Sequence, residues 1–445
     1  MTKIEAFSPN FKDGGAPGIA PFGTLSPLIP SDAELIKLSR NNASELKSGW
    51  FCTPLFFSMF NELLTGNGGI IKLPAGAAYQ LKDISAVISY AATSTANSVE
   101  AAVAELKRKQ PDATIPSADT VFKYLTTNEV DAVLRFFRQA NSELLTVIGI
   151  PKEPVDIAVD FHDCPYYGDK SDPSVRGIKP KNGASWGHSF FTLDLIDDPK
   201  STLDIVSVNG LNKDYAMLLE TVISRLKERG LELGTLFLDR EFFNLSSIRT
   251  LSSLQVNFIM AAPSNKRIKR LWEEHKRGNG IVPAIFTYRF KARDSPSFFL
   301  IAIPHPDHPT TGAEKKSEFL LFATNIDFCS LTSFVSHVPE EYRRRWNIET
   351  GYRVKNVFKI RTCAKKALPR VLFFVIQCLL HNFLNALKRI LELSAQRLKA
   401  LIAEDIERLQ RRIVFRVPRF REFYAALRRY NTRRQSELRT RLAAV

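Results

Sequence analysis

The stretch that decides the fold is Val155-Asp156-Ile157-Ala158-Val159-Asp160, an apolar run that closes on a carboxylate. A second run, Thr235-Leu236-Phe237-Leu238-Asp239, has the same character. Both are typical of short, largely buried strands whose last residue is acidic. If these strands are parallel neighbours, Asp160 and Asp239 emerge at the same edge of one sheet, with backbones roughly 5 Å apart. The alternative is that each Asp merely caps the turn that follows it.

A third acidic residue lies far downstream, in the basic segment Tyr342-Arg343-Arg344-Arg345-Trp346-Asn347-Ile348-Glu349. An α-helix turns by about 100° per residue, so with Glu349 at zero one stripe holds positions at about +20°, −40°, +40° and −20°. These positions are Tyr342, Arg345, Arg353 and Asn356. A surface helix with salt-bridged charges has a similar look. However, a lone carboxylate among cations better suits a metal ligand flanked by phosphate binders, and three carboxylates suit a pair of hard divalent cations that runs phosphoryl transfer.

The charge of the chain indicates a polyanionic partner. The 445 residues carry a formal net charge of +16, with a pI near 9.6. From Lys388 to Val445 sixteen Lys and Arg stand against six Asp and Glu, and fourteen of the sixteen are arginine, which binds phosphate in a forked geometry. Nucleic acid and an acidic membrane surface both fit this balance, and a merely soluble basic protein is the third alternative.

Cysteine usage and hydropathy narrow the class of protein. The five cysteines lie far apart without a CxxC pair, which argues against a zinc ribbon or a disulfide framework and favours a reducing cytoplasm. Residues 1–30 lack the apolar core of a signal peptide. The longest apolar stretch, Val371 to Leu387, contains Gln377, His381, Asn382 and Asn385. It therefore predicts a buried core helix rather than a membrane span.

The pattern of the chain predicts an α/β fold, with a mixed sheet and helices packed on it. Its length favours more than one domain. We expect a flexible arm at 1–30, a helical N-terminal DNA-binding region at 31–150, a first core part at 151–263, a β-rich insertion at 264–337, a second core part with the Glu349 helix at 338–394, and a basic helical tail at 395–445. The short N-terminal helices are compatible with a helix-turn-helix DNA reader and equally with a small helical bundle.

Within these parts the expected elements can be placed. Helices are expected at 98–109, 118–125, 129–141, 215–229, 245–254, 265–270, 339–360 and 368–393. Strands are expected at 155–160, 189–196, 203–208, 235–239, 256–261, 284–290, 298–303 and 319–323.

These residues resemble the DDE transposases of bacterial and archaeal insertion sequences, in the group marked by a Tyr-Arg-Glu-Lys signature. That signature is Tyr, two residues, Arg, three residues, Glu, six residues and Lys, and Tyr342, Arg345 and Glu349 match it in type and spacing. The stretches Asp160-Phe161-His162-Asp163 and Leu238-Asp239-Arg240-Glu241-Phe242 resemble its first two acidic blocks. The resemblance covers about residues 150–390. It implies a ribonuclease H-like core with a β-rich insertion just before the catalytic helix.

The resemblance implies a DNA transposase that cuts and joins DNA at the ends of an insertion sequence. It assigns Asp160, Asp239 and Glu349 as ligands of two Mg²⁺ or Mn²⁺ ions. Contacts to DNA near the cut are assigned to Tyr342, Arg345, Trp346, Arg353, Lys355, Lys359 and Arg240. Trp346 could stack on an unpaired base or lie in the core. Reserve acids, should the ligand choice be off by a few residues, are Asp163, Asp169 and Glu241.

The same resemblance implies double-stranded DNA as the partner, both at the element ends and at the target, and a homodimer assembled on it. We expect no membrane partner and a cytoplasmic, nucleoid-associated location.

One position departs from the family pattern, because Asn356 stands where the signature has Lys. Lys355 and Lys359 are close, but at about −120° and −80° from Glu349 they leave the stripe, so Arg353 is the better substitute. The departure affects the phosphate contact more than the metal site. It leaves two alternatives open: a catalytically inactive or domesticated DNA-binding protein, and a nuclease of the same fold.

Overall fold

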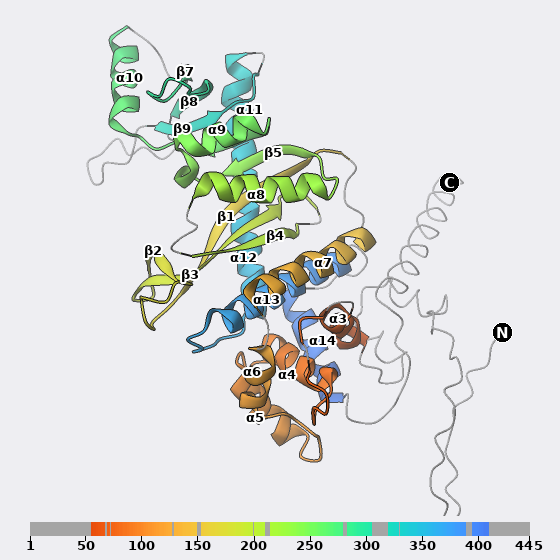
Figure 1. The fold of residues 1–445 in the computed structure, drawn as a ribbon. Coiled ribbons are helices and arrows are strands. Elements are labelled where there is room, and N and C mark those ends of the chain that lie inside the picture. Colours follow the sequence, from red (N-terminus) through yellow and green to blue (C-terminus); the bar gives the residue numbers. More distant parts are fainter. Residues whose placement is uncertain are drawn as a thin grey trace, which may run out of the picture.

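Figure 1 shows an elongated molecule, with a sheet in its upper part and a cluster of helices at its lower end. The fold is that of a computed structural model, which describes residues 55–66, 69–71, 73–126, 129–148, 153–198, 200–209, 214–278, 283–304, 319–328, 330–388 and 394–408. The predicted arm at 1–30 and the part of the predicted tail beyond residue 408 lie outside the described residues.

The described residues form one sheet of nine strands. They are β1 (Val155–Pro165), β2 (Arg176–Lys181), β3 (Ala184–Leu195), β4 (Thr202–Val208), β5 (Leu233–Leu238), β6 (Asn257–Ala261), β7 (Ala284–Tyr288), β8 (Phe298–Pro304) and β9 (Phe319–Thr324). The strand order is β2-β3-β1-β5-β6-β9-β8-β7, and β4 pairs with β3 beside this path. β3 is antiparallel to β1 and β4, whereas β5 is parallel to both β1 and β6. The α/β class is confirmed, and the mixed sheet is consistent with the expected ribonuclease H-like core.

Helices cover both faces of this sheet (Figure 1). On one face lie α8 (Tyr215–Glu228) and α9 (Leu245–Ser253), and on the other lie α11 (Leu331–Arg344) and α12 (Trp346–Lys355). Side chains of a strand alternate between faces, so Ile157 and Val159 of β1 join the core under α8 and α9, while Ala158 packs in the cluster that contains Ile348 of α12. The apolar run of β1 is thus explained by burial on both of its faces.

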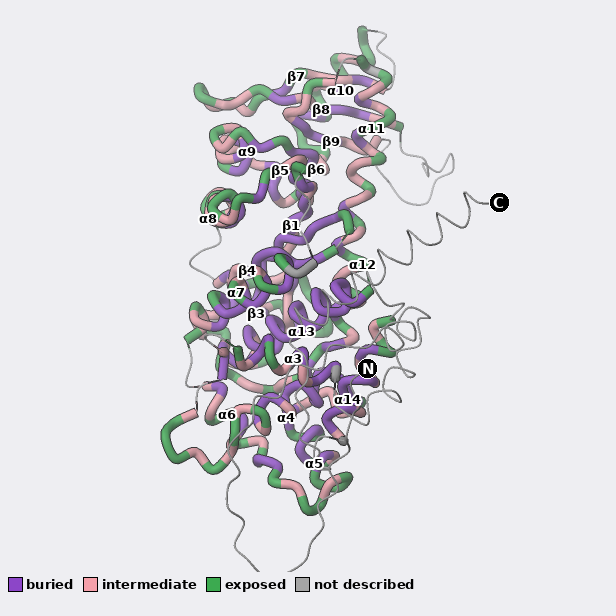
Figure 2. Tube along the Cα trace, turned by 90° about the vertical axis from the view of Figure 1, so that its right-hand side faces the viewer, coloured by how far each residue is buried: buried purple, intermediate pink, exposed green. Residues whose placement is uncertain are grey.

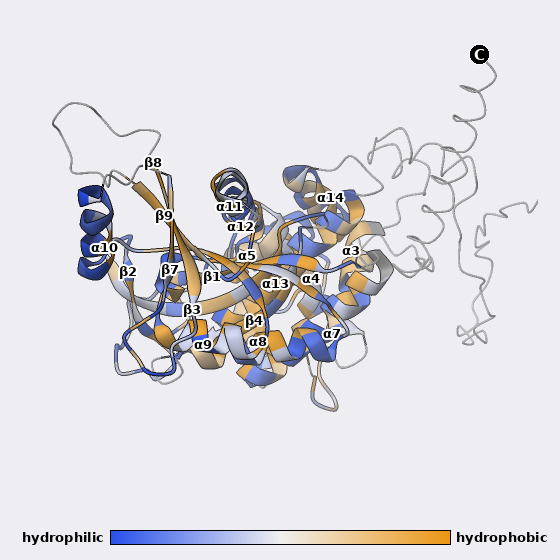
Figure 3. Ribbon diagram, turned by 90° about the horizontal axis from the view of Figure 1, so that it is seen from above, coloured by the Kyte–Doolittle hydropathy of each residue, from blue (hydrophilic) through white to orange (hydrophobic). Residues whose placement is uncertain are grey.

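The strands of the predicted insertion extend the main sheet instead of forming a separate unit. β9 pairs with β6 in antiparallel register, and β8 and β7 follow in order. The basic helix expected at 265–270 is α10 (Lys266–Arg277), which lies at the far end of this part. Figure 3 shows its hydrophilic character clearly. One strand, β2, was not among the expected elements, because Ile178 is its only large aliphatic residue and no apolar alternation is visible.

The apolar stretch before the basic tail is α13 (Ala367–Lys388), a core helix as predicted. Its length and composition would allow it to cross a membrane, but 89% of its most apolar window is buried inside the protein. Figure 2 shows this burial. Its polar residues have partners: the Asn382 amide donates to the Thr202 carbonyl at 2.8 Å and to Asn141 Oδ1 at 2.7 Å.

The described residues of the predicted N-terminal region, from 55 on, form helices as expected, and residues 31–54 lie outside the described residues. These helices are α3 (Leu55–Thr65), α4 (Leu81–Thr93), α5 (Val99–Lys109), α6 (Ala118–Leu125) and α7 (Val130–Ile148). The first described part of the predicted tail, α14 (Ala395–Arg408), packs against α3 and α4 with Leu398, Leu401 and Ile402 buried. It therefore belongs to this helical cluster. DNA binding by residues 31–150 stays a prediction.

Candidate active site

Asp160 lies where β1 loses its parallel neighbour. β1 pairs with β5 as far as Ala158 opposite Phe237, and β5 ends at Leu238. The same register, continued, places Asp160 level with Asp239. Side chains two residues apart along a strand point to the same face of the sheet. Asp160 therefore faces the same side as Ala158, and Asp239 the same side as Phe237. Both carboxylates therefore belong to the face that α12 covers.

The expectation that β1 ends at Asp160 was wrong. The strand continues to Pro165, with Phe161 opposite Phe191 and Pro165 opposite Gly187 of β3. The apolar pattern did not indicate this extension, because it contains polar residues such as His162 and Asp163. Asp160 is consequently held from one side by a paired strand, which fixes its backbone more firmly than a loop would.

Each aspartate gives one oxygen to a local hydrogen bond. Asp160 Oδ1 accepts from the backbone N–H of Phe161 at 2.8 Å, and Asp239 Oδ1 accepts from that of Arg240 at 2.7 Å. Asp239 thereby caps the short 3-10 turn η1 (Arg240–Phe242). The capping that the sequence left as an alternative is therefore present at Asp239 but not at Asp160, after which β1 continues. Each carboxylate keeps a second oxygen for other partners.

The helix that carries Glu349 is broken at Arg345, so the expectation of one helix from Pro339 to Ile360 was wrong. α11 begins earlier, at Leu331, and contains Pro339 in its interior, while the chain after α12 forms a 3-10 turn at 356–358. Between α11 and α12 the Arg345 N–H donates to the Tyr342 carbonyl at 3.0 Å. This three-residue spacing is the tight turn that often marks a functional segment within a helix.

Arg345 joins the acid on the helix to the acid on the strand. Its guanidinium Nη2 donates to Glu349 Oε1 at 3.1 Å, and Nη1 lies 3.9 Å from Asp160 Oδ2. The side chain is buried, with 9% exposure, and its Nε has no hydrogen-bond partner in the structure. The guanidinium also lies 5.5 Å from the ring centroid of Tyr342. Arg345 thus contacts both Glu349 and Asp160, and the assignment of these two acids as metal ligands stays a prediction.

The site raises the pKa of Asp160 to about 6. Burial is the main cause, Arg345 acts in the opposite direction, and the negative charges of Asp239 and Glu349 raise this pKa further. Burial also raises the pKa of Tyr342 to about 12, against the effect of Arg345. Asp239 and Glu349 therefore lie close enough to Asp160 to repel its negative charge.

The donor set fits hard divalent cations. Asp160, Asp239 and Glu349 offer only oxygen ligands, and Arg345 alone does not balance three negative charges. The Glu349 side chain is 46% exposed on the helix surface, so it has room to turn toward a cation. Within the described part of the chain, however, no three His, Cys, Asp or Glu side chains stand close enough together to form a metal-binding group as they are placed.

The other predicted DNA contacts fall into two groups. Trp346 is 64% exposed, which excludes the core alternative, and Arg240, Arg353 and Lys359 are exposed. Lys355 is fully buried, and its ammonium donates to Asp194 Oδ1 of β3 at 2.5 Å. The prediction of a DNA contact at Lys355 is therefore wrong, because a lysine in the interior cannot reach a phosphate.

The reserve acids make other contacts. Asp163 lies 3.6 Å from Arg176, and Asp169 is exposed on a loop, where it accepts from the Ser171 N–H at 2.9 Å. Glu241 forms an ion pair with Lys179 at 2.5 Å.

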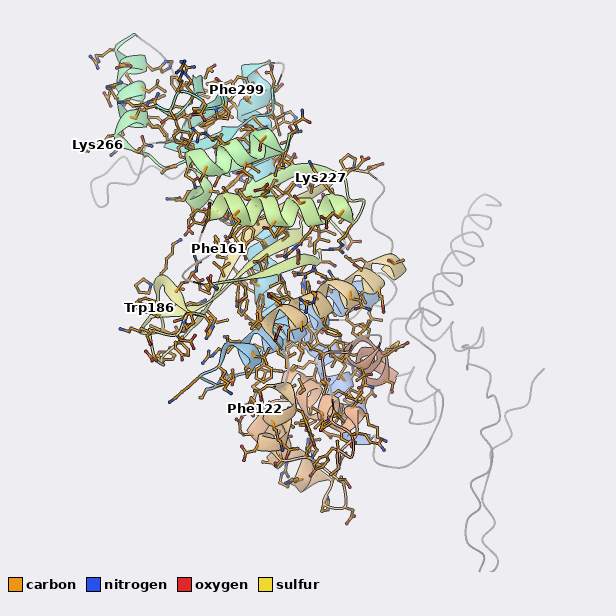
Figure 4. The ribbon with its side chains drawn as sticks, in the orientation of Figure 1. Phe122, Phe161, Trp186, Lys227, Lys266 and Phe299 are labelled. Atoms are coloured by element: carbon orange, nitrogen blue, oxygen red, sulfur yellow. The ribbon has the colours of Figure 1, made fainter. Side chains whose placement is uncertain are left out.

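Sequence reasoning missed Lys179. It lies on β2 with its side chain 78% exposed. Glu241 raises its pKa most, and the charges of Asp239 and Asp160 act in the same direction. Lys179 therefore reaches the acidic edge from a different element than Arg345. Trp186, labelled in Figure 4, belongs to the same β2–β3 hairpin. The only signal in the sequence was the turn Asn182-Gly183, which favours a hairpin.

Comparison with known proteins identifies the family. The family model described as a transposase DDE domain matches residues 152–383, more than half of the chain. The chain therefore belongs to the DDE transposases, as the resemblance implied. A comparison with curated proteins gives no match.

A solved structure supports the fold. The chain is similar to the cryo-EM structure of a piggyBac transposase synaptic complex with hairpin DNA, with a TM-score of 0.51 and 12% sequence identity. The match covers 86% of this chain and 83% of that chain. At this identity the likeness concerns the fold, and it agrees with the ribonuclease H-like core.

Asp160→Asn is predicted to stabilise the metal-free protein at neutral pH. The folded-state pKa of about 6 exceeds the ordinary value of 3.8, so ionisation of Asp160 opposes folding, and the parent loses stability as pH rises from about 4 to 6. Asn has no such charge. Its advantage should be about 1–3 kcal/mol above pH 7, since one pKa unit corresponds to about 1.4 kcal/mol, and it should vanish near pH 4.

Chemical denaturation in the presence of chelator, at a series of pH values, measures this difference. Asp169→Asn, at an exposed loop position, is the control and should show no such pH-dependent gain. A variant Asp160→Asn that is less stable than the parent at pH 8 would contradict the burial of an unfavourable charge.

Proposed function

We propose that this chain is a metal-dependent DNA transposase that cuts DNA at the ends of an insertion sequence and joins the freed end to another strand. The observation that carries the proposal is the position of Arg345, whose guanidinium contacts both Asp160 and Glu349. It brings the acid of a distant helix to the strand acid that lies level with Asp239. We propose that the three carboxylates gather at this sheet edge when metal ions bind, and such a set suits phosphoryl transfer better than any other chemistry that these residues support.

Asp160, Asp239 and Glu349 are the proposed ligands of two Mg²⁺ or Mn²⁺ ions. When bound, such ions lower the pKa of water and neutralise charge on the phosphate under attack. Arg345 holds Asp160 and Glu349 near each other before the ions bind, and it offsets part of their mutual repulsion. The signature implies a phosphate contact for Arg345, but its guanidinium is buried and paired with Asp160 and Glu349, so we assign it to holding these two acids.

The reaction needs two displacements at phosphorus. In the first, the oxygen of water bonds to phosphorus, and the 3′-oxygen of the element end leaves and takes up a proton. In the second, that 3′-hydroxyl loses its proton and attacks a phosphodiester of the target, so one P–O bond forms as another breaks. No outside energy source is required, since each step exchanges one phosphate ester bond for another bond to oxygen.

The exposed cations around the site supply the binding surface for double-stranded DNA. Arg240, Arg353 and Lys359 are the proposed phosphate contacts from the sequence, to which we add Lys179. We propose that Trp346, which is beside Arg345 and 64% exposed, stacks on an unpaired base. By family resemblance, two copies of the chain assemble on DNA. The DNA-bound protein is then expected in the cytoplasm, associated with the nucleoid.

Removal of any one of the three carboxylates is predicted to abolish cleavage without abolishing DNA binding. Asp160→Ala, Asp239→Ala and Glu349→Ala should each lower cleavage of a supercoiled plasmid that carries the flanking ends by about 100-fold or more, because several kcal/mol of transition-state stabilisation are lost. Binding to the same ends should persist, since the cationic surface is unchanged. The assay is run with Mg²⁺, with Mn²⁺ and with chelator.

Asp169→Ala is the matched control, because it removes an exposed acid from a loop. The alternatives have distinct outcomes in this assay. Cut products without strand-transfer products indicate a nuclease of the same fold. If the parent binds the ends but, like the three alanine variants, does not cleave them, the protein is a catalytically inactive DNA-binding protein.

Lys179→Ala is predicted to weaken DNA binding and to reduce the slope of log K against log salt concentration by about 1, the effect of one lost phosphate contact. Lys179→Arg should restore both. Lys227→Ala is the control, because α8, where Figure 4 labels Lys227, covers the opposite face of the sheet. Equal salt slopes for Lys179→Ala and Lys227→Ala would rule out the contact. Fluorescence anisotropy with labelled end DNA measures the slopes.

A further inference from the structure

A buried polar cluster lies between α12 and β3, away from the exposed side of the site. Lys355 is fully buried and Asp194 is 5% exposed, and the lysine ammonium donates to Asp194 Oδ1 at 2.5 Å. Thr202 donates to the same oxygen at 2.6 Å, and Thr192 donates to Asp194 Oδ2 at 3.0 Å. The carboxylate therefore has three partners, and these partners hold its pKa below the ordinary value despite burial.

Tyr352 completes this cluster from the helix. Its hydroxyl lies 2.5 Å from Thr192 Oγ1, which makes a hydrogen bond between α12 and β3. The Lys355 ammonium lies 4.6 Å from the centroid of the Tyr352 ring, and the His162 ring lies 4.9 Å from it. The side chains of Tyr352 and Lys355 thus attach the last turns of α12 to β1 and β3 by several directed contacts.

The cluster is connected to the candidate ligands on both sides. Thr192 is the cross-strand partner of Asp160 in the β1–β3 register. Tyr352 lies one helical turn after Glu349 on α12. A displacement of α12 relative to β3 would therefore change the separation of Glu349 and Asp160.

Burial of a charged pair needs an explanation, because an apolar pair of similar volume is often as stable or more so. An ion pair with hydrogen bonds is directional, so it fixes one position of the helix on the strand. The signature has Lys where this chain has Asn356, and Lys355, one position earlier, lies about 100° away around the helix and points inward.

We propose that Lys355, Asp194, Tyr352 and Thr192 are positioning residues that fix α12 on β3, and so hold Glu349 where it can share a metal ion with Asp160. The inference rests on the proposed function of that site. None of the four residues contacts the substrate or the ions in this account. They act through the position of α12.

The test compares variants that remove these directional contacts without leaving an unpaired buried charge. Lys355→Met combined with Asp194→Asn has no charge in the cluster, and Tyr352→Phe removes only the bond to Thr192 Oγ1. The matched control is Asp204→Asn, which removes another fully buried acid, on β4, whose partners are Arg225 at 3.3 Å and Arg138 at 3.7 Å. Two readouts are used: Mn²⁺ affinity by calorimetry, and amide hydrogen exchange of residues 346–355 in metal-free protein.

We expect the double variant and Tyr352→Phe to bind Mn²⁺ about 10-fold or more weakly than the parent, the usual effect of losing support behind a metal ligand. Amide exchange in α12 should be faster in both. Asp204→Asn should keep the parent's Mn²⁺ affinity and α12 exchange even if its midpoint of thermal unfolding falls. If the double variant fails to fold, Tyr352→Phe decides by the same two readouts.

Parent-like Mn²⁺ affinity and α12 exchange in the folded variants would overturn the inference, because the cluster would then be only a part of the core. Failure of the proposed function looks different. In that case the parent itself shows no Mn²⁺ binding that depends on Asp160 and Glu349, and the inference falls with it.

Discussion

A carboxylate on a strand buried from both faces is the constraint on which the rest of this structure depends. β1 lies between β3 and β5 with helices on each side, so a charge at Asp160 is unfavourable, as its raised pKa shows. The fold provides one buried cation for it, Arg345, at a break between two helices. The same guanidinium contacts Glu349. By pairing with both this half-buried acid and Glu349, the guanidinium draws a second acid, from a remote segment, toward Asp160.

Much of this arrangement could be predicted from the sequence. The period of the apolar residues indicated the strands and helices of the core, and the acids that follow the two apolar runs, Asp160 and Asp239, indicated a shared edge. What the sequence concealed depends on tertiary contacts. β2 and the end of β1 are polar and are stabilised by pairing with β3. Lys355 points inward to Asp194, a partner distant in sequence. A helical wheel cannot show whether position 355 or position 356 faces the core.

Family membership and fold agree with this account and extend it in different ways. The family model covers residues 152–383, which contain both aspartates, the glutamate helix and most of α13. The helical cluster of α3 to α6 with α14 lies outside that match. The likeness to the piggyBac transposase complex covers 86% of the chain and therefore reaches beyond the family match. The departure from the signature at Asn356 is local, and Lys179 offers a cation at the same acidic edge from another strand.

The central claim is that Asp160, Asp239 and Glu349 bind a shared pair of metal ions. Anomalous diffraction at the manganese edge, from crystals grown with Mn²⁺ and end DNA, tests it most directly. Two peaks about 3.5–4 Å apart, the spacing of two-metal sites, are expected, with an oxygen from each of the three side chains on at least one peak. Manganese bound elsewhere, or a site in which any of the three carboxylates remains beyond ligand distance, would contradict the account.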